Sequence, residues 1–189
     1  PYGGYVLSGS SVGVWVAAID KSYGKAEITE PIYYSVESDN TTVGQAVINN
    51  DGYATLYGDG DVYFSAVTGE AYGSTMLHSV SNPDSIVIKN ESDGSEVSSL
   101  SVSSGQTVYL TADSVYQNIN LTDSDEAYSW SVSDENLGTI SADGTFIPGN
   151  VSGTGTINVS AGSVSASVNL TVSAGPEQIP TSTPRPLET

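Results

Sequence analysis

The chain has very little of the chemistry on which most enzyme sites depend. Its 189 residues include no cysteine and one histidine, His78, which excludes thiolate chemistry and a histidine metal triad. A serine hydrolase would need that histidine beside a nucleophile on a sharp turn, and no such motif is present. His78 instead falls in a closing strand predicted over residues 76–80, at the place of Leu170 in a second copy described below. The sequence therefore predicts a protein that is not an enzyme and has no cofactor.

Basic residues are equally scarce. Four Lys and Arg face 22 Asp and Glu, for a formal net charge of -18. Nucleic acids and anionic membrane surfaces both require cationic patches, so we expect neither as a partner. No run approaches the roughly 18 apolar residues that cross a bilayer, which argues against direct membrane insertion. Cations or glycans suit this charge better.

The middle and the last third of the chain repeat one pattern. Residues 34–36 (YSV), 50–53 (NDGY) and 60–66 (GDVYFSA) find counterparts in 130–132 (WSV), 142–145 (ADGT) and 155–161 (GTINVSA). Corresponding positions lie about 92 to 96 residues apart, which is the size of a small β-sandwich. The repeat predicts two tandem domains of one kind, joined near residues 81–83.

Strand signals are clearest in the second copy. We expect a first strand split over 85–89 and 97–102, then strands at 107–112, 127–133, 137–141, 145–147, 155–161 and 163–173. Trp130 should face inward, and Asp93-Gly94 and Asp143-Gly144 mark hairpin turns. In the last strand apolar and polar residues alternate, as in a strand with one buried face. This is the pattern of a seven-stranded sandwich.

Residues 130–172 carry a resemblance to a known family. The segments WSVSD, GTI, ADGTF and GTGTINV, followed by an alternating valine strand, resemble the group 2 bacterial immunoglobulin-like domains of invasins, intimins and other surface proteins. The resemblance covers about residues 84–173 and implies immunoglobulin-like β-sandwiches acting as stalks, adhesive tips or appendages to enzymes, without catalytic residues. The first copy matches more loosely, with Tyr34 in place of the tryptophan. We expect an all-β chain with domains at 1–82 and 83–173, both immunoglobulin-like β-sandwiches.

An apolar segment near the start of the first copy does not fit an isolated sandwich. Residues 12–19 (VGVWVAAI) are apolar at every position, whereas a strand with one solvated face should alternate. Either they form an ordinary core strand with small outward residues, or this edge is completed by a neighbouring subunit through β-augmentation. The second reading makes an assembly interface of Val12, Val14, Trp15, Val16 and Ile19.

The last sixteen residues change in character. Residues 174–189 hold four of the eight prolines among Ser and Thr, which predicts an extended Pro/Thr-rich tail. It serves either as a linker or stalk, or as a segment that lies along a neighbouring subunit.

Six N-glycosylation motifs point to an exported protein. The chain starts at Pro1 and not at Met, which we interpret as a processed form or a fragment. The motifs begin at Asn40, Asn90, Asn120, Asn150, Asn158 and Asn169. Together with the acidic, Lys-poor composition they predict a glycoprotein on the outside of a bacterial or archaeal cell.

Acidic turns offer a weak candidate for calcium. Clustered loop carboxylates can supply oxygen ligands, but no segment matches a complete calcium loop, and solvated acidic turns explain the same residues. The candidates are Asp59, Asp61, Asp123, Asp125 and Glu126.

The sequence thus predicts a structural subunit of an extracellular assembly, such as a filament, sheath, surface layer or adhesin, whose copies join by strand pairing and apolar contacts. The alternative is a carbohydrate-binding or spacer module of a larger exported enzyme, with the twelve tyrosines supplying sugar-stacking faces.

Overall fold

The computed structural model describes residues 4–14, 16–17, 27–38, 45–48 and 52–175. Over these residues the chain is all-β, as predicted, and its helical segments are two single turns of 3-10 helix, Asp125–Ala127 (η1) and Glu135–Leu137 (η2). Trp15, Ile19, Asn40 and the tail from residue 176 lie outside the described residues. The division into domains at residues 82 and 173 stays a prediction.

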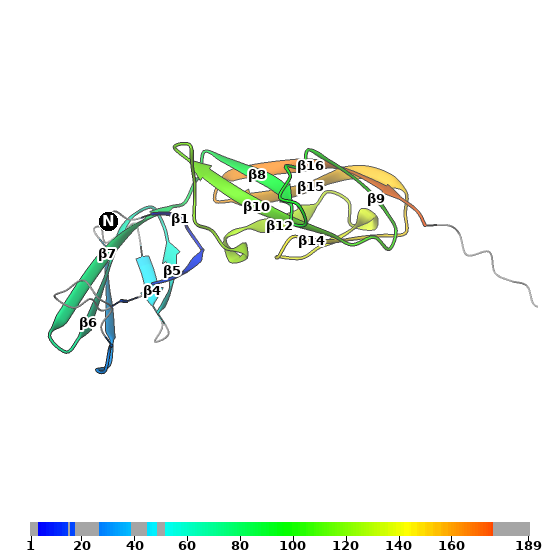
Figure 1. Ribbon diagram of the computed structural model, residues 1–189. Coiled ribbons are helices and arrows are strands. Elements are labelled where there is room, and N and C mark those ends of the chain that lie inside the picture. Colours follow the sequence, from blue (N-terminus) through cyan, green and yellow to red (C-terminus); the bar gives the residue numbers. More distant parts are fainter. Residues whose placement is uncertain (1–3, 15, 18–26, 39–44, 49–51, 176–189) are drawn as a thin grey trace, which may run out of the picture.

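The N-terminal half contains two sheets (Figure 1). One has the order β1-β7-β6-β3 and the other β2-β5-β4. β1 runs parallel to β7, and the other pairs are antiparallel. The strands are β1 Tyr5–Leu7, β2 Ser11–Gly13, β3 Tyr33–Ser38, β4 Gln45–Ile48, β5 Tyr53–Tyr57, β6 Gly60–Thr68 and β7 Ala71–Val80.

The C-terminal half also contains two sheets. The first has the order β11-β10-β14-β13, with β8 paired to β10, and the second has the order β12-β15-β16-β9. The split first strand is confirmed, because β8 joins one sheet and β9 the other. The strands are β8 Ser85–Asn90, β9 Ser99–Ser103, β10 Val108–Tyr116, β11 Ile119–Asn120, β12 Ser129–Val132, β13 Gly138–Ile140, β14 Thr145–Pro148, β15 Gly153–Ala161 and β16 Val164–Ser173.

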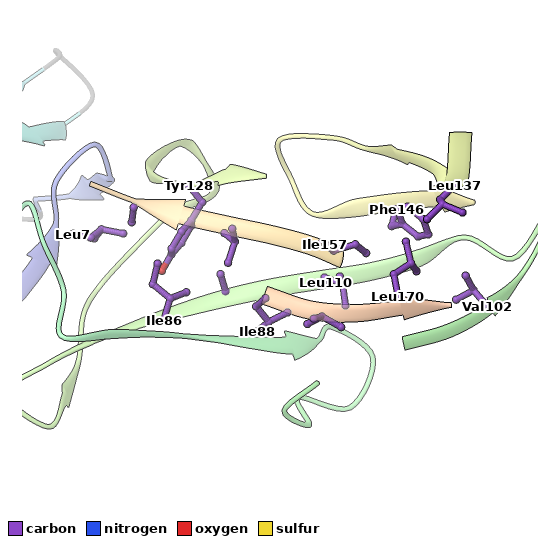
Figure 2. Close-up of a cluster of buried hydrophobic side chains, with 14 of the residues drawn as sticks. Leu7, Ile86, Ile88, Val102, Leu110, Tyr128, Leu137, Phe146, Ile157 and Leu170 are labelled. Carbon is purple, nitrogen blue, oxygen red and sulfur yellow. The ribbon is translucent and has the colours of Figure 1, made fainter. Parts of the chain in front are cut away.

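Each pair of sheets encloses a cluster of buried side chains. The alternation predicted for the last strand is confirmed: Val168, Leu170 and Val172 of β16 are buried, whereas the residues between them are exposed. Trp130 packs against the same cluster, as expected for an inward-facing residue. Figure 2 shows this C-terminal cluster, with Leu7 from the N-terminal half at one end of it. A separate cluster in the N-terminal half contains Val6, Val12, Ala54, Leu56, Val62 and Phe64.

The predicted Asp-Gly turns take backbone conformations that favour glycine. Gly94 and Gly144 have φ angles of 68° and 80°, which side chains tolerate poorly. At Gly144 an added Cβ would also lie 2.0 Å from the carbonyl oxygen of Leu110. This turn therefore holds the β13–β14 connection tightly against β10.

The two halves are joined by backbone hydrogen bonds as well as by the covalent chain. The Leu7 N–H donates to the Thr122 carbonyl oxygen, and the Thr122 N–H donates to that of Tyr5, both at 2.9 Å. Beside them the Ser124 N–H donates to the hydroxyl of the buried Ser10 at 3.1 Å. From this junction the halves extend in diverging directions, and β16 carries the chain to the far end of the C-terminal half (Figure 1).

Candidate assembly surface

The two halves can be aligned through equivalent hydrogen bonds. The Val14 N–H donates to the Gly52 carbonyl oxygen at 2.7 Å, and the Leu110 N–H donates to that of Gly144 at 3.1 Å. Because Gly52 and Gly144 are the glycines of the two Asp-Gly repeats, Val14 is the counterpart of Leu110. β2 and the residues after it therefore correspond to β10.

In the C-terminal half the outer edge of β10 is covered. β8 pairs with it in antiparallel register from Leu110 to Val115. The inward side chains of β8, Ile86 and Ile88, are 8% and 4% exposed, and β8 also contacts β16 of the opposite sheet. β8 thus pairs along one sheet and closes the space between the two sheets.

The described part of the N-terminal half has no counterpart of β8. Its smaller sheet starts at β2, and no described strand pairs with the outer edge of that strand. β2 is also short: it ends at Gly13, and Val14, Val16 and Ala17 lie outside any strand, although the sequence predicted a strand over 12–19. The corresponding stretch of β10 is held by its pairing to β8, and no described strand holds Val14, Val16 and Ala17 in this way.

Within the described residues a groove is open beside this edge. We call it the edge groove, and its volume is about 190 Å³. It lies between the segment that follows β2 and the inner faces of β6 and β7. Its lining residues are Val14, Val16, Ala17, Phe64, Ser65, Ala66, Gly73, Ser74 and Thr75. None of them is ionisable, so the edge groove offers backbone polar groups and apolar surface and no acid, base or charge.

The register of β7 shows what is uncovered. Tyr34 and Trp130, which the repeat aligns, lie opposite Ala66 and Val159, so these two residues are equivalent in the structure, and the sequence alignment of 60–66 with 155–161 is shifted by two residues. Gly73 lies opposite Ala66 and Thr75 opposite Phe64, as Ala166 lies opposite Val159 and Val168 opposite Ile157 in the C-terminal half. Val168 is 0% exposed, whereas every residue from Ala71 to Thr75 is exposed. The same position is therefore buried beside β8 and open in the N-terminal half, whose described strands include no counterpart of β8.

The interface residues expected from the sequence occupy different places. Val12 is buried within the chain's own N-terminal cluster, at 8% exposure. Val14 and Val16 are half-buried and line the edge groove. Trp15 and Ile19 lie outside the described residues. The sequence did not predict that Gly73, Ser74 and Thr75 line this surface. The closing strand was predicted to begin at Met76, whereas β7 begins at Ala71.

The sequence alignment also placed His78 one residue out of register. In the register set by Tyr34 and Trp130, Val62 is equivalent to Gly155; Val62 lies opposite Leu77 and Gly155 opposite Leu170, so Leu77, and not His78, is the counterpart of Leu170. His78 points to the other face, where its Nδ1 lies 2.6 Å from a carboxylate oxygen of Asp61 and its ring contacts Tyr5 edge-on at 5.3 Å. The side chain is half-buried and held by its neighbours, as a structural strand residue would be.

Most of the candidate calcium ligands are engaged in local hydrogen bonds. Asp59 accepts from the Ser81 N–H at 2.7 Å. Asp123 accepts from the Tyr128 hydroxyl at 2.5 Å and from the Ser114 N–H at 3.1 Å. Asp125 and Glu126 form η1 and are exposed. No group of three potential metal ligands occurs among the described residues, and calcium binding stays a prediction.

Burial raises the pKa values of Asp123 and of its hydrogen-bond partner Tyr128. Asp123 is partly desolvated, which raises the pKa of its carboxyl despite the two hydrogen bonds. Desolvation likewise raises the pKa of the Tyr128 hydroxyl, with a further contribution from its bond to Asp123. The Tyr128 hydroxyl also lies 2.8 Å from that of Ser114, so the group is a closed polar network beside the core.

The glycosylation motifs lie on strands and turns of the C-terminal half in five of six cases. Asn120, Asn150 and Asn169 are exposed, whereas Asn90 and Asn158 are half-buried. The side-chain oxygen of Asn90 accepts from the Ser92 N–H at 3.0 Å. Asn40 lies outside the described residues. The exposed three are open to modification, and their occupancy stays a prediction.

A row of large side chains crosses the outer face of the β3-β6-β7 sheet. Tyr33 lies opposite Val67, and Val67 lies opposite Tyr72. These side chains are 69%, 40% and 68% exposed. Hydrogen bonds with Ser65 and Ser74 lower the pKa of the Tyr72 hydroxyl. The row is a flat surface that could stack against a sugar ring or a protein.

Comparisons with known proteins reach the chain only through structure. No family model matches it, and no curated protein matches it in sequence. Among solved structures, domains 1-6 of the surface layer protein SbsC match with a TM-score of 0.37 and 17% identity, over 90% of this chain and 26% of that one. Invasin, a bacterial integrin-binding protein, matches with a TM-score of 0.32 and 16% identity, over 82% and 34%. The C-terminal fragment of intimin matches at 0.31 and 14%, over 74% and 51%.

These values describe a distant likeness in which the chain spans about a quarter of the SbsC fragment.

Within the described residues, no helix is long and apolar enough to cross a membrane.

Proposed function

We propose that this chain is a non-enzymatic structural subunit of an extracellular surface assembly, in which copies join by strand pairing and apolar contact. The observation that carries the proposal is the edge groove, which lies where the C-terminal half places β8. A sandwich edge that lacks a strand presents unpaired backbone groups beside uncovered apolar surface. Both are satisfied together when a strand from another molecule is added.

The energetic gain can be judged from β8. That strand buries Ile86 and Ile88, and full burial of such side chains stabilises by about 1.5–3 kcal/mol each. A donor strand of similar length would add backbone hydrogen bonds, each contributing about 0.5–1.5 kcal/mol. Together, side-chain burial and backbone hydrogen bonds supply the free energy that offsets the entropy cost of association and holds the subunits together. The gain is doubled where each copy makes two such contacts.

The lack of catalytic chemistry supports a structural role. The edge groove contains no ionisable side chain, and His78 is tied to Asp61 and Tyr5. An extracellular location is supported by the six glycosylation motifs, three of which lie on exposed residues. The net charge of -18 keeps dispersed copies apart, so assembly should strengthen as salt screens that repulsion.

A carbohydrate-binding role is the second candidate, and the row of Tyr33, Val67 and Tyr72 favours it. Tyrosine rings exposed on a flat sheet are suited to stacking on pyranose faces. This role predicts that a Tyr33→Ala/Tyr72→Ala double variant loses retention on a glycan array while its oligomeric state is unchanged.

Gly73→Leu tests the assembly role. An added Cβ at Gly73 meets nothing within 4 Å, so leucine fits the fold and fills the edge groove. We expect the wild-type chain to form concentration-dependent oligomers in sedimentation velocity and polymers in electron microscopy, and Gly73→Leu to remain monomeric with the same circular dichroism spectrum. The matched control is Ser101→Leu, which adds the same side chain at an exposed position of β9. A wild-type chain that stays monomeric at high concentration and salt, or a Gly73→Leu variant that assembles as well as the control, contradicts the proposal.

A further inference from the structure

We infer that the strand which fills the edge groove is the segment 177–183 from the tail of a second copy of this chain. The inference rests on the proposed function, because it names the donor for the assembly contact. It would make the contact head-to-tail, with the tail of one subunit in the N-terminal half of the next.

The tail starts at the end of the molecule opposite the edge groove. Ser173 ends β16, whose first residues lie at the junction, where the Asn82 side chain accepts from the Ser163 N–H at 2.9 Å. Ten strand residues then carry the chain about 30 Å from the junction. The edge groove lies on the other side, about 23 Å from the junction along β7, because Gly73 precedes Val80 by seven residues.

The segment therefore cannot fill the edge groove of its own molecule. Thr183 lies ten residues beyond Ser173 and can be at most about 36 Å from it. The two halves diverge from the junction (Figure 1), so the path from Ser173 back to the edge groove is longer than that. The acceptor must be another copy, in which the edge groove is free.

The prolines of the tail leave one edge of an extended strand intact. Backbone N–H and C=O groups of successive residues point to opposite edges, and proline lacks the N–H. All four tail prolines, Pro176, Pro180, Pro184 and Pro186, occupy even positions. An extended tail thus keeps a complete set of donors on its odd edge, at Glu177, Ile179, Thr181 and Thr183. Proline is tolerated in strands only on such an unpaired edge.

Charge also matches the tail to the edge groove. Residues 178–184 (QIPTSTP) are uncharged in a chain of net charge -18, and the residues that line the edge groove carry no charge either. Burial of residues 178–183 therefore leaves no ionised group without a partner, which would be costly, and Glu177 is the first residue of the proposed segment, where its carboxylate can stay in solvent. The uncharged stretch is slightly longer than the six residues of β8.

A head-to-tail contact of this kind has a consequence for the assembly. A donor and an acceptor at opposite ends form a heterologous interface, which continues into an open polymer unless the rotation between subunits closes a ring. The contact predicts a linear polymer whose repeat is one chain.

The absence of natural cysteine permits a clean cross-linking test. Ala17, which lines the edge groove and is exposed, is changed to Cys in one sample, and Thr181→Cys is made in another. The two proteins are mixed, oxidised and run on a non-reducing gel. We expect a heterodimer band from Ala17→Cys with Thr181→Cys, and at least tenfold less from Thr139→Cys, an exposed site on β13, with Thr181→Cys.

A composition-matched variant tests the proline argument. Exchanging Ile179 and Pro180, as Ile179→Pro with Pro180→Ile, moves one proline to the odd edge without changing composition. We expect this variant to lose the heterodimer band and the polymers. Equal cross-linking of the exchanged and the native tail overturns the inference.

Deletion of residues 176–189 separates this inference from the proposed function. If the shortened chain still polymerises and Gly73→Leu still prevents it, another strand fills the edge groove and the tail assignment is wrong, while the assembly role stands. If the full chain never polymerises, the assembly role itself is contradicted. Loss of polymers on deletion, with recovery when residues 176–189 are restored at the C-terminal end, supports both.

Discussion

Thr75 in β7 lies at the position that Val168 occupies in β16, yet Thr75 is exposed and Val168 is fully buried. The two residues face equivalent partners, Phe64 and Ile157. The difference follows from β8, which contacts β16 and has no described counterpart over β7. A threonine is tolerated at this place because the side chain is exposed and no described strand covers it.

This pair gives a reciprocal test of the missing strand. Val168→Thr places a hydroxyl in a closed core and should lower the free energy of unfolding by about 1–3 kcal/mol. Thr75→Val should change the free energy of unfolding of the dispersed chain by less than about 0.5 kcal/mol. Urea denaturation of both variants at low protein concentration measures the difference. Equal losses at the two sites would mean that Thr75 is as covered as Val168.

Adjacent residues of β1 should stabilise different halves. Leu7 is buried in the C-terminal cluster and Val6 in the N-terminal one, at 0% and 1% exposure. Leu7→Ala should destabilise the C-terminal half by about 2–5 kcal/mol, and Val6→Ala the N-terminal half by about 2 kcal/mol. Differential scanning calorimetry shows which transition moves. A Leu7→Ala effect confined to the N-terminal half would show that the junction does not couple the two.

The fold could be predicted where the repeat and the alternation were strong. The split first strand and the alternating last strand of the second copy were predicted because Asp-Gly turns and buried valines fix their limits. β11, of two residues, was missed because its pairing with Val115 and Tyr116 depends on a turn through Gln117 and Asn118, both with positive φ and neither a glycine.

The assembly surface was only partly predictable. The apolar run at residues 12–19 indicated a sheet edge that requires a covering strand. Such a run can be recognised without knowing the strand register, because it is apolar at every position. The contribution of Gly73 and Thr75 depends on which face of β7 they occupy, and a shift of one residue exchanges the faces. The same shift placed His78 where Leu77 lies. Backbone contacts such as that between Leu7 and Thr122 leave no trace in composition or pattern.

Stability should depend on pH through Asp123. Desolvation raises the pKa of this carboxyl above its value in the unfolded chain, so the folded state binds the proton more tightly. The cost of the buried charge is then fully present above the folded pKa and disappears as the pH falls below the unfolded pKa. Asp123→Asn should remove this dependence and gain most relative to wild type near neutral pH. Denaturation midpoints from pH 3 to 8 measure it.

Asp93 supplies a control of opposite sign. A hydrogen bond from the Ser95 hydroxyl, followed by one from its N–H, lowers the pKa of the Asp93 carboxyl. Its contribution to stability is present above the unfolded pKa and is lost as the pH falls through the folded pKa. If Asp123→Asn and Asp93→Asn shift the pH profile in the same direction, the assignment of the Asp123 pKa is wrong.

The two turn glycines should differ in their tolerance of alanine. Both have positive φ, which costs a non-glycine residue about 1–2 kcal/mol. Gly94→Ala should cost no more than this, because nothing lies within 4 Å of the added Cβ. Gly144→Ala should cost several times as much, because its Cβ would meet the Leu110 carbonyl oxygen. Thermal unfolding of both variants compares them, and similar melting temperatures would contradict the tight β10 contact.

Hydrogen exchange at the edge groove tests the central claim most directly. The Val14 N–H already donates to the Gly52 carbonyl oxygen, so the informative amide is that of Ala17, whose N–H faces the other edge of an extended segment and should exchange fast in the dispersed chain. In assembled material the Ala17 amide should become protected at least tenfold, while the amides of Val14 and of exposed residues on β13 stay unchanged. Assemblies in which the Ala17 amide exchanges as fast as in the single chain would contradict the account.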